Sequence, residues 1–184
     1  PLFHAVNANN QIQPITWPPE VTLHPDGGHM ILFGTGKYLE TSDNSSNQVQ
    51  SFYGIRDWHD GATTVGTRAA DLLEQTVELT VLDGVNFRTP SDNPISLRGM
   101  DCVPPYADNC NVGTHMGWYM DLPTSGERLT GIPKLESGTV FFNTFIPSTS
   151  PCDAGGTGWF MTLDFLDGSL LAFPMFDTDG DGDI

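Results

Sequence analysis

The chain contains few basic residues, and this shortage limits the partners it can bind. Seven Lys and Arg stand against 23 Asp and Glu in 184 residues, which gives a formal net charge of −16. A charge of this size repels the phosphates of nucleic acids and anionic lipid headgroups. The sequence also lacks an apolar run of about 18 residues, the length that a transmembrane helix requires. We therefore expect no nucleic-acid partner and no transmembrane segment.

Cysteine is also scarce, and the three cysteines are an odd number. Cys102 and Cys110 enclose a short loop with Pro and Asn, and their spacing predicts a disulfide. Cys152 is then free or paired outside this segment; the alternative is three reduced, packed thiols. No CxxC pair is present to begin a zinc site.

The chain also lacks the usual features of a protein start. It begins at Pro1 without an initiator Met, a basic segment or an apolar signal core. We therefore expect a fragment or a processed product.

Turn-forming residues are abundant, in contrast to these absences. There are 20 Gly and 14 Pro, and Asn, Asp, Ser and Thr fill the intervals between short apolar runs. This composition is typical of many strands joined by turns, so we predict an all-β fold. One short helix is expected within 68–74, where Gly66 and the β-branched pair at 76–77 limit its length.

One sequence unit occurs twice in the second half of the chain. Residues 117–122 read GWYMDL and residues 158–163 read GWFMTL, and their separation of about 40 residues is in the range of propeller blades. Alternate residues of each copy, beginning with Trp118 or Trp159, would share one face of a strand. Each copy continues through a turn into a further short strand, 127–129 or 169–171, so both copies are predicted to be hairpins.

A second pair of similar segments precedes these strands. Residues 19–35 and 133–144 share a Pro, a short strand, a Gly turn and a longer apolar strand that ends in Thr. The first is followed by a strand at 51–55 and the second by the Trp159 strand, so joining the halves gives a four-stranded unit like one blade of about four strands. Two such units cannot close a ring of about four to eight blades. We therefore predict an incomplete β-propeller with quinoprotein-type blades, completed by further sequence or by another chain.

The expected organisation has three parts. Residues 1–57 form a hairpin tail, with strands near 1–5 and 12–16, and the first blade. Residues 58–116 form an insertion with a long Cys-bearing loop and a hairpin, whose strands at 76–82 and 85–88 are joined by Asp-Gly, a strong hairpin signal. Residues 117–184 form later blades and an Asp-rich end.

The Asp-rich end predicts a calcium site. Asp177, Asp179 and Asp181 occupy positions 1, 3 and 5 of a calcium loop, followed by a Gly at position 6. Asp183 falls at position 7, where the backbone carbonyl is the usual ligand, while position 12 lies beyond Ile184. The alternative interpretation is a solvated acidic tail, and a half-loop alone should bind calcium weakly.

Other chemistry-bearing residues favour structural roles. We expect His24, His29 and the His59-Asp60 pair to be turn and surface residues, because no HExxH or GxSxG pattern accompanies them. The GTGK segment at 34–37 lacks the spacing of a phosphate loop. The tryptophans Trp17, Trp118 and Trp159 are expected to pack within blades and not to form a binding platform.

Several longer sequence words are more specific than these motifs. The segments at 1–16, 117–122 and 146–157 and the words FGTGKYLE at 33–40, SFYGI at 51–55 and GER at 126–128 resemble the C-terminal propeller of the PilC/PilY family of type IV pilus assembly factors and tip adhesins. The resemblance extends almost from end to end. It implies a modified β-propeller in a secreted or outer-membrane-associated protein, at the cell surface or the pilus tip.

The resemblance also implies a function without enzymatic activity. Family members promote pilus extension and attach to host or abiotic surfaces, and calcium-binding aspartate loops couple the metal to pilus extension and retraction. The expected partners are minor pilins at the pilus tip, the remaining blades and a surface. The alternatives are a quinone-dependent dehydrogenase-like propeller, for which no full catalytic constellation is visible, and a carbohydrate-binding propeller.

Overall fold

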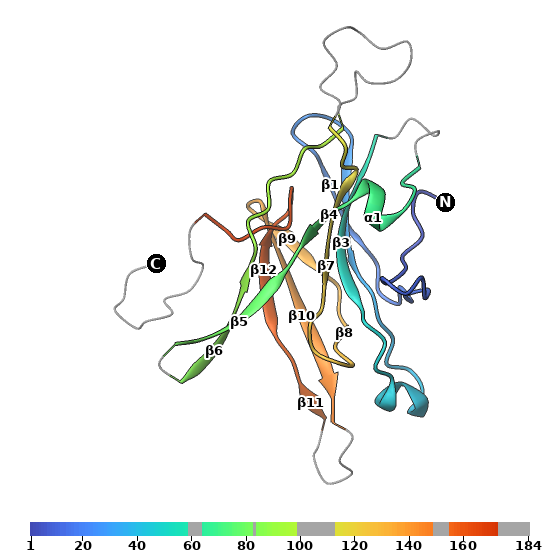
Figure 1. The fold of residues 1–184 in the computed structure, drawn as a ribbon, viewed down its shortest axis with the longest axis vertical. Helices are drawn as coiled ribbons and strands as arrows, with labels where there is room; N and C mark the ends of the chain where they lie inside the picture. Colours follow the sequence, from blue (N-terminus) through green and yellow to red (C-terminus); the bar gives the residue numbers. More distant parts are fainter. Residues whose placement is uncertain (59–63, 83, 99–112, 149–154, 173–184) are drawn as a thin grey trace, which may run out of the picture.

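The chain folds as strands around two facing sheets (Figure 1). The computed structural model describes residues 1–58, 64–82, 84–98, 113–148 and 155–172. The described helical elements are the 3-10 helix η1 (Thr41–Ser45) and the short helix α1 (Arg68–Asp71). The described strands are β1 (Glu20–Leu23), β2 (His29–Gly34), β3 (Ser51–Asp57), β4 (Leu73–Gln75), β5 (Val77–Leu82), β6 (Val85–Pro90), β7 (Gly117–Asp121), β8 (Arg128–Leu129), β9 (Lys134–Glu136), β10 (Thr139–Pro147), β11 (Gly156–Thr157) and β12 (Phe160–Asp164).

The first sheet has five strands in the order β1-β2-β3-β7-β4. Pairing is antiparallel from β1 to β7, and β4 then joins β7 in parallel. The turn between β1 and β2 contains Gly27 and Gly28 with φ of 92° and 78°, a backbone region that glycine enters without steric cost. Strand β7 comes from the far side of the insertion and pairs directly with β3.

The second sheet is built around the long strand β10. Strands β9 and β8 pair with one edge of β10, and β12 and β11 pair with the other. Strands β5 and β6 form a separate two-stranded sheet, in which Leu82 pairs with Val85. Gly84 has a φ of 81° in this turn, as an Asp-Gly hairpin requires.

Most predicted strands are confirmed. The β1-β2 and β9-β10 hairpins, the strand after each of them, the β5-β6 hairpin and the short helix α1 all form where the sequence predicts them. The all-β fold is confirmed, and the sheets formed by the described residues do not close into a ring.

Two local predictions are wrong because other contacts satisfy the backbone. Residues 128–129 pair with β10 and not with β7. The Leu129 amide donates to the carbonyl of Thr35, and the Arg128 guanidinium donates to the carbonyl of Lys37 in the loop after β2. Residues 169–171 form no strand; the Leu170 amide donates to the carbonyl of Ser91 in the insertion instead.

The two N-terminal strands are also absent. Residues 1–16 form only isolated bridges, between Val6 and Ile12 and between Ile15 and Gly36. The Asn7 carboxamide oxygen accepts hydrogen bonds from the amides of Asn9 and Gln11, which closes a local turn in place of a ladder.

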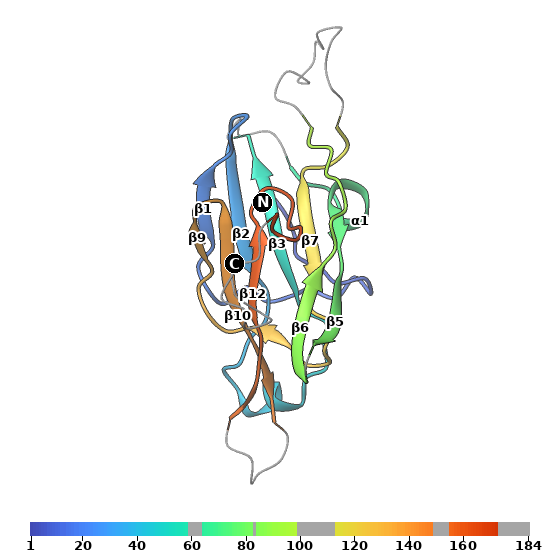
Figure 2. The same ribbon diagram turned by 90° about the vertical axis from the view of Figure 1, so that its left-hand side faces the viewer.

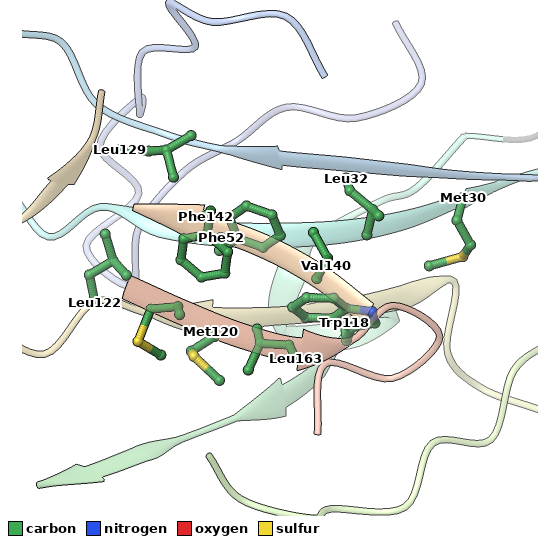
Figure 3. Packing of buried hydrophobic residues seen from close by; sticks show 11 residues of the cluster. Met30, Leu32, Phe52, Trp118, Met120, Leu122, Leu129, Val140, Phe142 and Leu163 are labelled. Carbon is green, nitrogen blue, oxygen red and sulfur yellow. The ribbon is translucent and has the colours of Figure 1, made fainter. Parts of the chain in front are cut away.

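The main core, which we call the inter-sheet core, lies between the two sheets (Figures 2 and 3). Phe52 of β3 stacks on Phe142 of β10 with ring centroids 4.0 Å apart and an interplanar angle of 7°. Its buried members are Met30, Leu32, Phe52, Trp118, Met120, Leu122, Leu129, Val140, Phe142, Met161 and Leu163. As predicted, alternate residues of β7 and of β12 share a buried face.

A second core, which we call the outer core, covers the opposite face of the first sheet. Its sheet members are Phe33, Tyr53, Ile55 and Tyr119, and they pack against the N-terminal segment and the region of α1. Strands β2, β3 and β7 are therefore buried on both faces. In β12 the pattern alternates, and Phe160 is 52% exposed.

Candidate functional site at the junction of the two sheets

The predicted ligand and disulfide residues fall outside the described part of the chain. These residues are Asp177, Asp179, Asp181, Asp183, Cys102, Cys110 and Cys152. The calcium loop and the disulfide thus remain predictions. Among the residues that the structure describes, no group of His, Cys, Asp or Glu is arranged to hold a metal ion.

His24 lies in the turn between β1 and β2, as predicted, but it is buried and not at the surface. Its Nδ1 accepts a hydrogen bond from the Asp26 amide, and its Nε2 has no hydrogen-bond partner. Burial, followed by the nearby Arg56 guanidinium, lowers the pKa of His24. The imidazole is therefore neutral at pH 7 and has a structural role in the turn. His59 and Asp60 are not described.

Trp118 joins the first sheet to the second. Its side chain is fully buried, and its Nε1 donates to the carbonyl of Phe165, 3.2 Å away in the turn after β12. Gly54 and Gly168 lie against its ring, and a Cβ at either position would overlap the indole. The indole therefore fills the joint between the sheets, which confirms the predicted packing role.

The Glu127 side chain of the GER segment extends this junction. Glu127 forms a bidentate ion pair with Arg88 of β6, at 2.5 and 2.7 Å, and both side chains are almost completely buried. The Arg88 guanidinium also lies over the Trp159 ring, 4.3 Å from its centroid. This pair therefore fixes the β5-β6 hairpin to the loop that connects the sheets.

Arg128 stabilises the loop after β2, residues 37–46, through hydrogen bonds to its backbone. Its guanidinium donates to the carbonyls of Lys37, Asp43, Ser46 and Gly126 at 2.7 to 3.0 Å. Within the loop, the Asp43 carboxylate accepts hydrogen bonds from the amides of Leu39 and Glu40 and pairs with Lys37. These hydrogen bonds, with that of Leu39 the strongest, lower the pKa of Asp43 to about 2. The loop is therefore fixed at both ends.

A third network ties the insertion to β7. Arg68 of α1 donates to the Asp121 carboxylate at 2.7 Å and lies 3.9 Å from the Tyr119 ring centroid. Although burial opposes the charge, the hydrogen bond and the charge of Asp121 raise the pKa of Arg68. The Tyr53 hydroxyl, which also borders this network, donates to Gln13 at 2.6 Å and so anchors the N-terminal segment.

Together, these networks account for most of the chain's few basic residues. Arg56, Arg68, Arg88 and Arg128 have little exposed area, and each guanidinium lies over an aromatic ring. Buried guanidinium groups require such partners, because a desolvated charge without them is costly. Their arrangement positions loops and shows no donor set for acid-base or nucleophilic chemistry.

Sequence reasoning missed this junction, although one signal was present. Glu127 and Arg128 stand side by side between two apolar strands in a chain that has only seven Lys and Arg. Adjacent opposite charges in such a position would have indicated buried partners. Trp17, predicted to pack within a blade, is instead 42% exposed and lines a groove.

In the described residues, no helix is long and apolar enough to cross a membrane. The described strands form no closed ring, since each of their sheets keeps its own edges.

Comparisons with known proteins agree with this architecture. Residues 1–85 match the family model described as the PilY1 beta-propeller domain. A type IV pilus biogenesis factor PilY1 homolog of Xylella fastidiosa is 34% identical over 174 residues, covering 91% of this chain and 11% of the relative. The type IV pilus biogenesis factor PilY1 of Pseudomonas aeruginosa is 28% identical over 194 residues, covering 96% of the chain and 16% of the relative. The chain thus spans a small part of these proteins.

A solved structure shares the fold. The C-terminal domain of Pseudomonas aeruginosa PilY1 superposes with a TM-score of 0.75 and 27% sequence identity, over 94% of this chain and 36% of that domain. The open sheets are those of an incomplete propeller, and the resemblance predicted from FGTGKYLE and SFYGI is confirmed. The chain belongs to the PilY1 β-propeller family.

Proposed function

We propose that the chain is part of the C-terminal propeller of a type IV pilus assembly factor that promotes pilus extension and surface attachment. The observation that carries this proposal is the shared fold with the PilY1 C-terminal domain over 94% of the chain. The relatives are named pilus biogenesis factors. The protein acts without catalysis, at the cell surface or the pilus tip.

The expected partners follow from this placement. Minor pilins at the pilus tip and a host or abiotic surface bind the intact protein, and the remaining blades of its propeller pack next to the second sheet. In the described residues β12 pairs with β10 alone, so one edge of this sheet can receive a further strand.

Calcium is the proposed regulatory ligand. Asp177, Asp179 and Asp181 supply carboxylate oxygens and Asp183 a backbone carbonyl, a donor set that suits a hard cation. Titration calorimetry on the intact protein should detect calcium binding that Asp179→Ala weakens. Equal heats for the two proteins would contradict this assignment.

Genetic complementation tests the pilus function. The gene that encodes the chain is deleted, and surface pili are counted after complementation with the wild-type protein, with Trp118→Ala or with the exposed Ile12→Ala control. We expect no pili without the gene, few with Trp118→Ala and normal numbers with Ile12→Ala. Normal piliation and attachment in the deletion strain would overturn the proposal.

A further inference from the structure

A groove of about 410 Å³ lies beside the loop after β2, where the two sheets meet. It is lined by Thr16, Trp17, Tyr38, Leu39, Thr130 and Phe145. Thr16 and Trp17 precede the first sheet, whereas Thr130 follows β8 and Phe145 lies in β10 of the second sheet. The groove therefore exists only when the two sheets are assembled.

Aromatic rings form the groove and remain accessible. Trp17 is 42% exposed and Tyr38 is 45% exposed. The Tyr38 ring meets the ring of Phe145 edge-on, with centroids 5.0 Å apart. Half-exposed tryptophan and tyrosine rings offer flat apolar faces with polar groups at their edges, and these suit ligands that are partly apolar and partly hydroxylated.

The groove is also preformed. The Thr16 hydroxyl donates to the carbonyl of Gly36 at 2.7 Å, which fixes the segment before Trp17. On the other side, Arg128 binds the Lys37 carbonyl at 3.0 Å, and the Asp43 carboxylate accepts the Leu39 amide at 2.9 Å. Both neighbours of Tyr38 are therefore held by hydrogen bonds, so a ligand need not order this loop on binding.

The charges around the groove favour a neutral ligand. All six lining side chains are uncharged. The nearest cations are already engaged: Lys37 pairs with Asp43 at 3.1 Å, and Arg128 is surrounded by backbone carbonyls. In a chain with a formal net charge of −16, no lining group remains to pair with a carboxylate or a phosphate.

We propose that this groove binds a neutral glycan, with a sugar ring stacked on Trp17 and Tyr38. The apolar face of a pyranose ring matches the aromatic faces. The sugar hydroxyls can donate to the Thr16 hydroxyl, whose own proton is given to the Gly36 carbonyl, and can donate to or accept from the Thr130 hydroxyl. This inference goes beyond the proposed pilus function, and it does not depend on it.

Calorimetry and tryptophan fluorescence on the intact protein test the proposal. The probes are lactose, cellobiose and N,N′-diacetylchitobiose, with 3′-sialyllactose as an anionic sugar and decaproline as a peptide that favours aromatic grooves. We expect at least one neutral disaccharide to bind, and Trp17→Ala or Tyr38→Ala to weaken it about tenfold, since a factor of ten corresponds to about 1.4 kcal/mol. Tyr38→Phe should retain binding, because it keeps the ring.

Two controls separate stacking from misfolding. Ile12→Ala removes an apolar side chain that is 81% exposed and lies outside the groove lining, and it should bind as the wild type does. Every variant should remain folded, with a cooperative thermal transition above the temperature of the binding assay. The proposal is overturned if no neutral probe binds, if Trp17→Ala and Tyr38→Ala bind normally, or if 3′-sialyllactose or decaproline binds more tightly than every neutral disaccharide.

Discussion

The two sheets repeat one strand arrangement but differ in what covers them. In both, an antiparallel hairpin is followed by a third strand on the other edge of its second strand, β1-β2-β3 in one sheet and β9-β10-β12 in the other. The first sheet adds β7 and β4, and its strands β2, β3 and β7 are buried on both faces. The second has one face in the inter-sheet core, while Phe160 on its other face is 52% exposed. The first therefore has the surroundings of an inner blade, and the second, within the described part of the chain, those of a blade with one uncovered face.

The doubled GW sequence does not mark equivalent strands. Strand β7 is the fourth strand of the first sheet, whereas β12 takes the third place in the second. The copies share a local geometry instead. A Cβ on Gly117 would overlap the carbonyl of Gly54, and a Cβ on Gly158 would overlap that of Thr144. Each glycine thus lets its strand approach its partner closely, just before a tryptophan turns toward the core.

The largest expected effect distinguishes the two tryptophans. Trp118→Ala empties the joint between the sheets, so we expect the free energy of unfolding to fall by about 5 kcal/mol, the upper end for a buried aromatic. Trp159 packs only partly against the core, so Trp159→Ala should cost about 2 kcal/mol. Urea unfolding of both variants checks the difference, and equal losses would show that the copies are equivalent.

Removing the Glu127 carboxylate should have the next largest effect. Glu127→Leu leaves the Arg88 guanidinium buried without its ion partner, and we expect a loss of about 3 kcal/mol. The double variant Arg88→Met/Glu127→Leu removes both charges and should recover most of this loss. Urea unfolding of the wild type, Glu127→Leu, Arg88→Met and the double variant measures the coupling. Additive losses would contradict a direct pair.

Truncating Arg128 should loosen one loop more than the whole fold. Arg128→Met removes hydrogen bonds to four backbone carbonyls, at a net cost of about 2 kcal/mol. Hydrogen exchange should accelerate in residues 37–46 and stay unchanged in β12. Uniform acceleration in both regions would show that Arg128 does not act locally.

The smallest expected effect is a pH dependence of the free energy of unfolding that arises from His24, in the turn between β1 and β2. The pKa of His24 is lowered in the folded chain from its ordinary value of 6.5. As the pH falls below 6.5, the unfolded chain therefore binds more protons at His24 than the folded chain does. The stability contributed by neutral His24 is fully present above pH 6.5 and decreases as the pH falls below it. His24→Gln should flatten this part of a stability profile measured between pH 5 and 8, and an unchanged slope would assign the dependence to another group.

The sequence predicted the fold better than the junction, for a physical reason. Strands such as β2 and β10 carry continuous apolar runs between turn signals, so local patterns suffice to place them. The junction depends on long-range contacts that local patterns do not reveal. Trp118 binds the carbonyl of Phe165, and Glu127 pairs with Arg88, each far away in the chain. The same limit explains Trp17. Its neighbouring prolines suggested packing, whereas its exposure depends on how the two sheets meet.

The structure of the intact protein tests the central claim most directly, through the strand that pairs with the edge of β12 opposite β10, where the described residues supply no partner strand. By analogy with β7 on β3, we predict that a later segment adds an antiparallel strand along Phe160–Asp164, while Trp118 keeps its hydrogen bond to Phe165. A β12 edge left in solvent, or a β7 strand paired with the second sheet, would contradict the account of two neighbouring blades in an incomplete propeller.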